Sequence, residues 1–260
     1  MRVIQESSGV IAVWKPAGVA TQAPPGIPSA ESWLRQRLHD GNPRGYVGVP
    51  HRLDRGVSGI VLFASTPRAA RKLSRQFERR QIQKAYRAIV GCGPAAAPHV
   101  DALERAGEGA ATQAAVGEGR HAGAVRWHDL VLKLPDEART RIASEGEPQA
   151  REAVTFVRLV RRLAPGRLLL ELAPVTGRMH QLRLQCSSRA MPILGDDLYG
   201  APDEAWLEPS PESLGAAHAV DARATPIALH AVRIVYADPD SGDEVTIEAP
   251  LPEFWPVSAR

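Results

Sequence analysis

The stretch HRLDRGVSGIVLFA, residues 51–64, decides the fold of this 260-residue chain. Its first nine residues are largely polar or charged and are interpreted as a loop. Residues 60–64 are all apolar, which is typical of a strand in the interior of a sheet rather than at its edge. Thr66 and Pro67 follow and predict the N-cap and first turn of a helix over residues 67–79.

Apolar runs and turn residues on either side of this stretch predict an α+β fold. A short helix is expected around Trp33, Leu34 and Leu38, and another over residues 179–189. Pro165-Gly166 and the turn at residues 238–242 each predict a hairpin. Further strands are expected at residues 10–14, 84–90, 154–163, 167–173, 227–236 and 245–249. Because strands dominate and hairpins recur, we expect a mixed, largely antiparallel central sheet flanked by helices and loops.

Two segments differ in composition from the rest of the chain. Residues 95–148 are rich in Ala, Gly and Glu, and only residues 125–134 within them have the pattern of an ordered element. Residues 201–225 carry three prolines and scattered acids. Both are interpreted as insertions into a single domain that covers residues 1–260.

The composition favours a polyanionic partner and a reducing compartment. The 32 basic residues include only four lysines and therefore 28 arginines, at a pI of about 9.1. Arginine grips phosphate well, although a genome that favours Arg codons explains the count equally. Cys92 and Cys186 lack the spacing of a zinc site, and the apolar run at residues 10–14 is too short for a signal peptide or membrane span. A cytoplasmic protein with no membrane contact is expected.

Asp54 is the first candidate for chemistry. It lies between Arg52 and Arg55, and the two guanidinium groups favour its ionised form, which suits a nucleophile or a base. A structural ion pair explains the same pattern, and local sequence leaves the choice open.

The run HRLDRGVSG resembles the motif HRLDxxTSG of the RluA-type pseudouridine synthases, except that Val57 replaces the usual Thr. Four further segments resemble family motifs in the same order, and LHA at 229–231 and APLP at 249–252 also fit. The four are WKPAGV at 14–19, KAYRA at 84–88, TGRMHQLR at 176–183 and PILGD…YG at 192–200. The resemblance spans nearly the whole chain outside the two insertions.

The resemblance implies an enzyme that converts uridine to pseudouridine in ribosomal or transfer RNA, with no cofactor and no metal. Asp54 would be the essential carboxylate, attacking the nucleotide or abstracting a ribose proton. Tyr86 would stack on the target uracil, and Arg183 would pair with Asp54. By residue type alone, the core is the favoured place for a strand tyrosine such as Tyr86, and Arg183 is equally a solvated helix arginine.

Several side chains are expected to bind RNA. Residues 68–87 hold eight basic side chains and one acid, Glu78, and so predict a basic stripe suited to an RNA backbone, although a solvated helix face has the same pattern. Arg52 would replace the flipped nucleotide in the stack, since extruding a base costs a few kcal/mol. The expected RNA-binding residues are Arg52, Arg55, His51, Arg178, His180, Gln181, Arg71, Lys72 and Arg75.

Other classes of protein fit less well. The aspartates around Gly242 lack the register of a calcium loop, and the histidines lack metal-ligand spacing. A glycosidase would need a second carboxylate near Asp54. A non-catalytic RNA-binding protein on the same scaffold is the remaining alternative. We also expect a monomer without a separate N-terminal RNA-binding domain.

Overall fold

The computed structural model describes residues 1–40, 45–110, 121–200, 225–256 and 259. Internal contacts divide the chain into two compact units. Unit 1 comprises Met1–Lys84 with Pro209–Phe254, and unit 2 comprises Ala85–Glu208 with Trp255–Arg260. The single domain expected over residues 1–260 therefore stays a prediction, and the insertion expected at residues 201–225 lies almost entirely outside the described residues.

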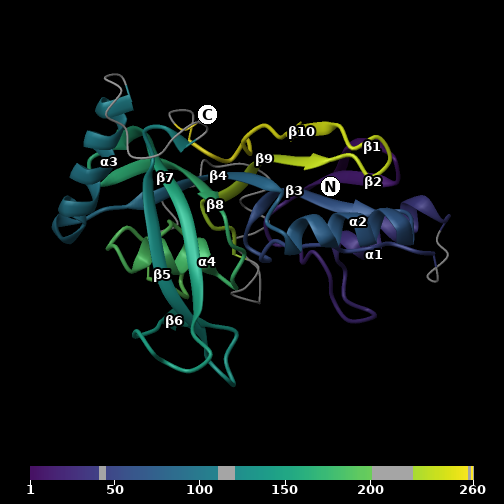
Figure 1. Cartoon of the computed structure of the whole chain (residues 1–260), viewed down its shortest axis with the longest axis horizontal. Helices are drawn as coiled ribbons and strands as arrows, with labels where there is room; N and C mark the ends of the chain where they lie inside the picture. Colours follow the sequence, from purple (N-terminus) through teal and green to yellow (C-terminus); the bar gives the residue numbers. More distant parts are fainter. Residues whose placement is uncertain (41–44, 111–120, 201–224, 257–258, 260) are drawn as a thin grey trace. The chain divides into compact units, whose positions relative to one another are not determined.

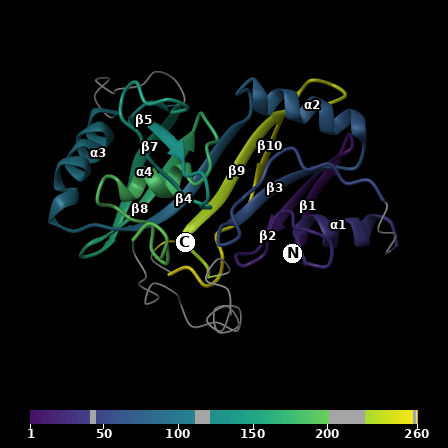
Figure 2. The same ribbon diagram turned by 90° about the horizontal axis from the view of Figure 1, so that it is seen from below.

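Unit 1 is a sheet with helices (Figures 1 and 2). Its elements are β1 (Arg2–Ser7), β2 (Val10–Lys15), α1 (Ala30–Leu38), β3 (Ser58–Ala64), α2 (Pro67–Glu78), β9 (Leu229–Ala237) and β10 (Glu244–Glu248). The strand order is β1-β2-β3-β9-β10. The pair β3–β9 is parallel, and the other pairs are antiparallel.

Strand β3 is the centre of unit 1, as its apolar run predicts. Every residue of β3 is buried, and β2 and β9 pair with its two edges. Helix α2 begins at the predicted cap, where Thr66 Oγ1 accepts a hydrogen bond from Ala69 N at 3.1 Å. The helix packs on β3 and β9 through Ala69 and Leu73, which are at most 1% exposed. A buried core thus forms between the helix and one face of the sheet.

Unit 2 is an antiparallel sheet with helices. Its elements are β4 (Gln83–Gly91, in this unit from Ala85), η1 (Pro94–Ala96), α3 (Ala97–Ala110), β5 (Val125–Lys133), β6 (Thr140–Ile142), β7 (Arg151–Ala164), β8 (Arg167–Pro174) and α4 (Gln181–Ser187). The strand order is β4-β8-β7-β5-β6, and each pair is antiparallel. The predicted hairpin at Pro165-Gly166 joins β7 to β8.

The expectation that only residues 125–134 are ordered within residues 95–148 is wrong. Helix α3 precedes them, and β5 and β6 extend the sheet beyond β7. Val100 and Leu103 are 5% and 1% exposed, and α3 packs against β7 and β5. This packing stabilises a helix whose glycines lower its own propensity, so composition alone was misleading.

Two further boundaries differ from the prediction. Helix α4 is shorter than residues 179–189, because His180 before it and Ala190 after it have positive φ angles of 52° and 54°. Strand β1 was not predicted. Its exposed and half-buried residues show no alternation, as is common for a strand at an edge.

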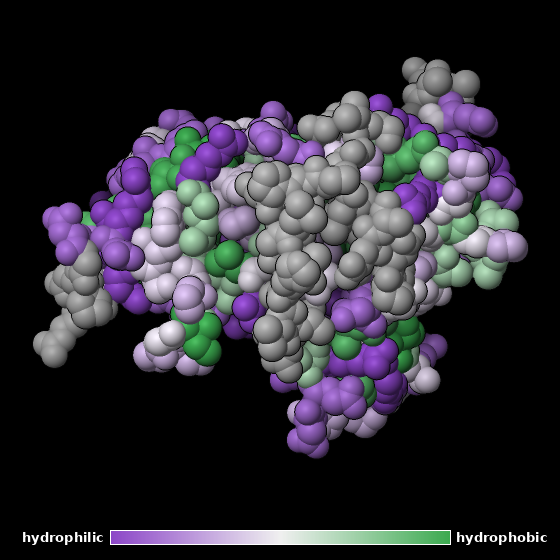
Figure 3. All heavy atoms as spheres, turned by 180° about the vertical axis from the view of Figure 1, so that it is seen from behind, coloured by the Kyte–Doolittle hydropathy of each residue, from purple (hydrophilic) through white to green (hydrophobic). Residues whose placement is uncertain are grey.

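The α+β class with a mixed, largely antiparallel sheet is confirmed. On the face shown in Figure 3, hydrophilic side chains are interspersed with small apolar patches. None of the described helices has the length and apolarity that a membrane span requires.

Candidate active site

The loop that carries Asp54 is fixed by hydrogen bonds to its main chain. Thr21 Oγ1 donates to Leu53 O at 2.9 Å and accepts from Leu53 N at 3.1 Å. Val57 N donates to Asp54 O at 3.1 Å, and Gly18 N donates to Arg55 O at 2.8 Å. The backbone on both sides of Asp54 is therefore anchored, while Asp54 itself is half-buried.

A buried lysine lies beneath this loop. Lys15 is fully buried, and its Nζ donates to Val19 O at 2.7 Å, Pro16 O at 3.0 Å and Arg55 O at 3.3 Å. Burial lowers the pKa of Lys15 to about 7, whereas the nearby Asp54 carboxylate raises it and Arg55 lowers it further. The side chain of Lys15 thus joins the Lys-Pro-Ala-Gly turn to the Asp54 loop through hydrogen bonds to both.

The Ser-Gly end of the Asp54 run meets the LHA motif of β9. Ser58 Oγ and His230 Nδ1 are hydrogen-bonded at 2.7 Å, and both side chains are buried. Gly59 has a φ of 117°, and a Cβ there would lie 2.3 Å from Ala231 O. Only glycine allows β3 to approach β9 this closely, so the contact holds two distant motifs together.

His51 has contacts within the protein. Its Nε2 accepts a hydrogen bond from Leu62 N at 2.9 Å, and its ring stacks on Phe77 of α2 with centroids 4.5 Å apart. Burial, with a smaller contribution from Lys84, lowers the pKa of His51 to about 3. His51 is therefore neutral at physiological pH and joins the loop to α2, and its expected RNA contact stays a prediction.

The two arginines that flank Asp54 differ in exposure. Arg52 is exposed, whereas Arg55 is half-buried and its Nε donates to Gly18 O at 2.9 Å. Val57, the departure from the family motif, is 2% exposed. An apolar side chain therefore fits this position without an unpaired hydroxyl.

Tyr86 lies in β4 of unit 2, opposite Leu172 of β8. Its side chain is half-buried, whereas the neighbouring Ala85 and Ala88 are buried. The ring is thus not a fully buried core group, and its stacking role stays a prediction.

Arg183 lies in α4 and forms a bidentate ion pair with Asp196. Its Nε and Nη2 donate to the two carboxylate oxygens at 2.7 and 2.8 Å. The Asp196 side chain is 0% exposed and that of Arg183 is 11% exposed. The guanidinium also lies 5.2 Å from the centre of the Tyr199 ring. Charge, planar geometry and packing together fix Arg183. The predicted pair with Asp54 concerns residues of different units and stays a prediction.

The TGRMHQLR segment is held to β7 by a buried glutamine. Gln181 Oε1 accepts from Thr176 Oγ1 at 2.7 Å and from Arg178 N at 3.0 Å, and its Nε2 donates to Val154 O at 3.1 Å. His180 Nδ1 lies 3.1 Å from the hydroxyl of Tyr199. Gln181 and His180 therefore shape the turn before α4, while RNA contact by Arg178, His180 and Gln181 stays a prediction.

The basic side chains of helix α2 have two different environments. Arg71 and Arg75 are exposed. The Nζ of Lys72 instead donates to the carbonyl of Pro239 in the turn between β9 and β10. The predicted basic stripe is therefore not uniform, because Lys72 binds a main-chain carbonyl of the protein while Arg71 and Arg75 are exposed.

Sequence reasoning quoted Lys15, Asp196 and His230 within motifs but assigned them no role. Their signal was residue type alone, since each is an ionisable group in or beside an apolar run. In the part of the chain that the structure describes, no group of three His, Cys, Asp or Glu residues is arranged to hold a metal ion.

Comparisons with known proteins identify the family of this chain. A family model described as RNA pseudouridylate synthase matches residues 9–188. Ribosomal large subunit pseudouridine synthase C of Rickettsia felis is 30% identical over 254 residues, which cover 97% of this chain and 68% of that protein. Dual-specificity RNA pseudouridine synthase RluA of Haemophilus influenzae is 28% identical, over 95% of this chain and 91% of that protein.

A solved structure shows the same fold. Human RNA pseudouridylate synthase domain containing 4 superposes with a TM-score of 0.66 at 22% identity, covering 99% of this chain and 90% of that chain. The chain therefore belongs to the RNA pseudouridylate synthase family, and within it to the RluA type.

Proposed function

We propose that this protein isomerises specific uridines to pseudouridine in ribosomal or transfer RNA, with Asp54 as the catalytic carboxylate on a flipped-out base. The bond from ribose C1′ to N1 of uracil breaks, a bond from C1′ to C5 forms, the C5 proton leaves, and N1 takes up a proton. Reactant and product have the same atoms, so the reaction consumes no co-substrate. We further propose a cytoplasmic, monomeric enzyme that needs no cofactor.

The observation that carries this proposal is the setting of Asp54. The carboxylate is half-buried, and it lies on a loop whose main chain is bonded to Thr21, Gly18 and Lys15. A fixed backbone holds a nucleophile or base in one position relative to a bound nucleotide, which lowers the entropic part of the barrier. A covalent or proton-transfer step at a ribose requires a carboxylate that stays in one position, and the hydrogen bonds to the loop main chain restrict its movement.

Tyr86, Arg183 and Arg52 complete the proposed machinery. Tyr86 stacks on the extruded uracil and assists removal of the C5 proton. Arg183 provides a positive charge for Asp54, and its pair with Asp196 keeps the guanidinium in one orientation. Exposed Arg52 enters the RNA stack in place of the flipped nucleotide. Stacking contacts of about 1–3 kcal/mol each offset the cost of extrusion.

The remaining RNA contacts are proposed outside this machinery. Arg55 and Arg178 have guanidinium groups within reach of solvent, and Arg71 and Arg75 are exposed on α2. The proposed set also keeps His51, His180, Gln181 and Lys72, whose observed bonds are to the protein. We expect these four to act on RNA chiefly by shaping the surfaces that touch it.

The proposal is tested by mapping pseudouridine in cellular RNA with and without the gene, and after return of wild-type protein or a variant. At least one uridine should lose modification in the deletion and regain it with the wild type but not with Asp54→Ala. Asp101→Ala removes an exposed carboxylate from α3 and is the matched control that should restore modification. Full rescue by Asp54→Ala, or no changed site, contradicts the proposal and favours a non-catalytic RNA-binding protein.

Purified protein tests the role of Tyr86. Tyr86→Phe keeps the aromatic face and should keep RNA binding, whereas Tyr86→Ala should lower turnover on a substrate RNA strongly. Unchanged turnover in Tyr86→Ala would show that the ring is only a packing residue.

A further inference from the structure

The two long edges of α2 have different surroundings. One edge faces the turn between β9 and β10, where the Arg68 guanidinium lies 3.2 Å from the Asp240 carboxylate and Lys72 donates to Pro239 O. Gln76 Nε2 donates to Ala237 O at 2.8 Å on the same edge. The cations of this edge are therefore engaged by the protein.

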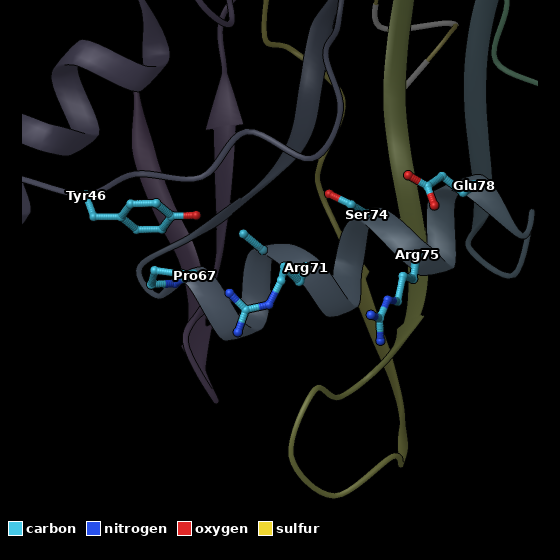
Figure 4. A pocket seen from close by; sticks show the side chains of 7 residues that line it. Tyr46, Pro67, Arg71, Ser74, Arg75 and Glu78 are labelled. Carbon is cyan, nitrogen blue, oxygen red and sulfur yellow. The ribbon is translucent and has the colours of Figure 1, made fainter.

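The other edge of α2 lines an open pocket of about 430 Å³ (Figure 4). Arg71 and Arg75 are both exposed there, and among the described residues neither has an ion-pair partner. Residues four apart on a helix are separated by about 6 Å along its axis, so the two guanidinium groups form a row. The lining residues are Tyr46, Pro67, Ala70, Arg71, Ser74, Arg75 and Glu78.

Tyr46 forms the wall of the pocket across from the helix and is held in place. Its side chain is 40% exposed. Two hydrogen bonds of 2.8 and 3.0 Å join the main chain of Gly48 to Ala64 at the end of β3, and Arg35 Nε donates to Gly45 O at 2.9 Å. A Cβ on Gly48 would lie 2.8 Å from the Ala70 Cβ and 2.9 Å from the Tyr46 hydroxyl, so glycine there lets the tyrosine approach α2.

We propose that this pocket is a second docking site for the substrate RNA, in which Arg71 and Arg75 bind neighbouring phosphates and Tyr46 stacks on an unpaired base. The site is distinct from the base-flipping machinery around Asp54, and it rests on the proposed function in that the ligand is RNA. Basic grooves with an aromatic platform bind single strands in this way, because phosphates meet the charges and every base has a face to stack. A planar guanidinium suits phosphate geometry.

The two ends of the pocket differ in charge. Glu78 lines the end of the pocket beyond Arg75. Its carboxylate repels phosphate, so the RNA backbone runs along the Arg71 end and leaves the pocket before Glu78. An acidic peptide would also be attracted by Arg71 and Arg75, but it has no base to place on the exposed tyrosine ring.

The test uses the full chain carrying Asp54→Ala, so that binding is measured without turnover. The probe is a fluorescent single-stranded RNA of 12 nucleotides with mixed sequence, titrated at several salt concentrations. Arg71→Gln with Arg75→Gln should weaken binding and lower the slope of log K against log salt by about 1.4, or about 0.7 for each lost phosphate contact. The charge-matched control, Arg105→Gln with Lys133→Gln, removes two exposed cations of unit 2 and should leave both values unchanged.

Three single variants separate stacking from charge. Tyr46→Ala should weaken binding by roughly fivefold or more, with an unchanged salt slope, because one stacking contact is lost. Tyr46→Phe should bind like the parent, and Glu78→Gln should bind more tightly because a repulsive charge is removed.

The proposal is overturned if the Arg71/Arg75 variant and its control lose the same affinity, since charge anywhere would then suffice. It is also overturned if a polyglutamate peptide competes with the RNA and Tyr46→Ala binds RNA normally, which would indicate an acidic protein partner. Either outcome leaves pseudouridine formation by the wild type untouched, whereas failure of the proposed function would appear in the mapping experiment.

Discussion

The Asp54 loop of unit 1 and the Arg183 segment of unit 2 hold their candidate side chains by different means. The loop is anchored through main-chain atoms, with Lys15 Nζ donating to three carbonyls and Thr21 bonded to Leu53. Arg183 is anchored through side chains, by the bidentate pair with the Asp196 carboxylate. A main-chain anchor distributes the constraint over several bonds, whereas a buried ion pair depends on one partner.

This difference has a consequence for mutation. A lost carbonyl contact leaves a polar atom that has other donors nearby, since Arg55 O also accepts from Gly18 N. A lost carboxylate removes both hydrogen bonds of the bidentate pair at once, from a guanidinium whose side chain is only 11% exposed. We therefore expect the Arg183 segment to be the more fragile of the two.

The largest effect is expected from Asp196→Asn. Removing the charge of the buried Asp196 carboxylate weakens both hydrogen bonds of the pair and should lower the free energy of unfolding by about 3–5 kcal/mol, measured by urea denaturation. Glu147→Gln breaks the solvent-accessible pair with Arg141 and is the control, expected to change the free energy of unfolding far less because water screens this pair. Equal losses in the two variants would show that burial does not strengthen the Arg183 anchor.

A smaller effect is expected from Lys15→Met, which keeps the length of the side chain but removes the donor. Buried carbonyls left without this partner should cost about 1–3 kcal/mol. The pKa of Lys15 is about 7 in the folded protein and 10.5 in the unfolded chain, so the unfolded chain binds the extra proton between these values. Wild-type stability should therefore gain from this group as pH rises from 7 to 10.5, and Lys15→Met should lack that gain. If the free energy of unfolding of Lys15→Met changed with pH in the same way as that of the wild type, the lowered pKa of Lys15 would be refuted.

The next effect is confined to acid. The pKa of His51 is about 3 in the folded protein against 6.5 in the unfolded chain, and His230 has the same shift. The unfolded chain alone takes up these protons as pH falls below 6.5, so the free energy of unfolding should fall between pH 6.5 and 3. His51→Gln should make this fall shallower, and thermal melts at a series of pH values measure it. His99→Gln, at a half-buried position of α3, is the control and should follow the wild type.

The smallest effect is expected from Val57→Thr, which restores the residue usual in the family motif. Val57 is 2% exposed, so the new hydroxyl is buried and should cost about 1 kcal/mol in the free energy of unfolding. A gain in stability would mean instead that the loop offers the hydroxyl a hydrogen-bond partner. That result would show that a threonine at this position adds a further hydrogen bond that anchors the Asp54 loop.

Local patterns predicted much of the fold. The apolar run at residues 60–64, the Thr66 cap and the Pro165-Gly166 turn appear as β3, α2 and the β7–β8 hairpin, because each depends on neighbours within a few residues. Helix α3 was missed because its stability comes from burying Val100 and Leu103 against the sheet. The start of α4 was misplaced because the left-handed backbone of His180 has no signal in residue type.

In the candidate site too, some features were predictable from the sequence and others were not. The order of five motifs was enough to identify the family and to select Asp54, Tyr86 and Arg183. The partner of Arg183 was not predicted, because Asp196 is 13 residues away and is brought to it only by folding. The anchoring of Leu53 by Thr21 spans 32 residues and carries no motif of its own.

By itself, the sequence determined the type of fold and the family and gave the candidate reactive side chains, since these are recorded in residue order and hydrophobic pattern. Only the tertiary structure decided that His51 is a neutral packing residue, that Lys15 has a depressed pKa, and that Lys72 faces a turn while Arg71 faces an open pocket. The physical reason is that pKa and availability for binding depend on burial and on neighbours in space, which residues far apart in the chain supply.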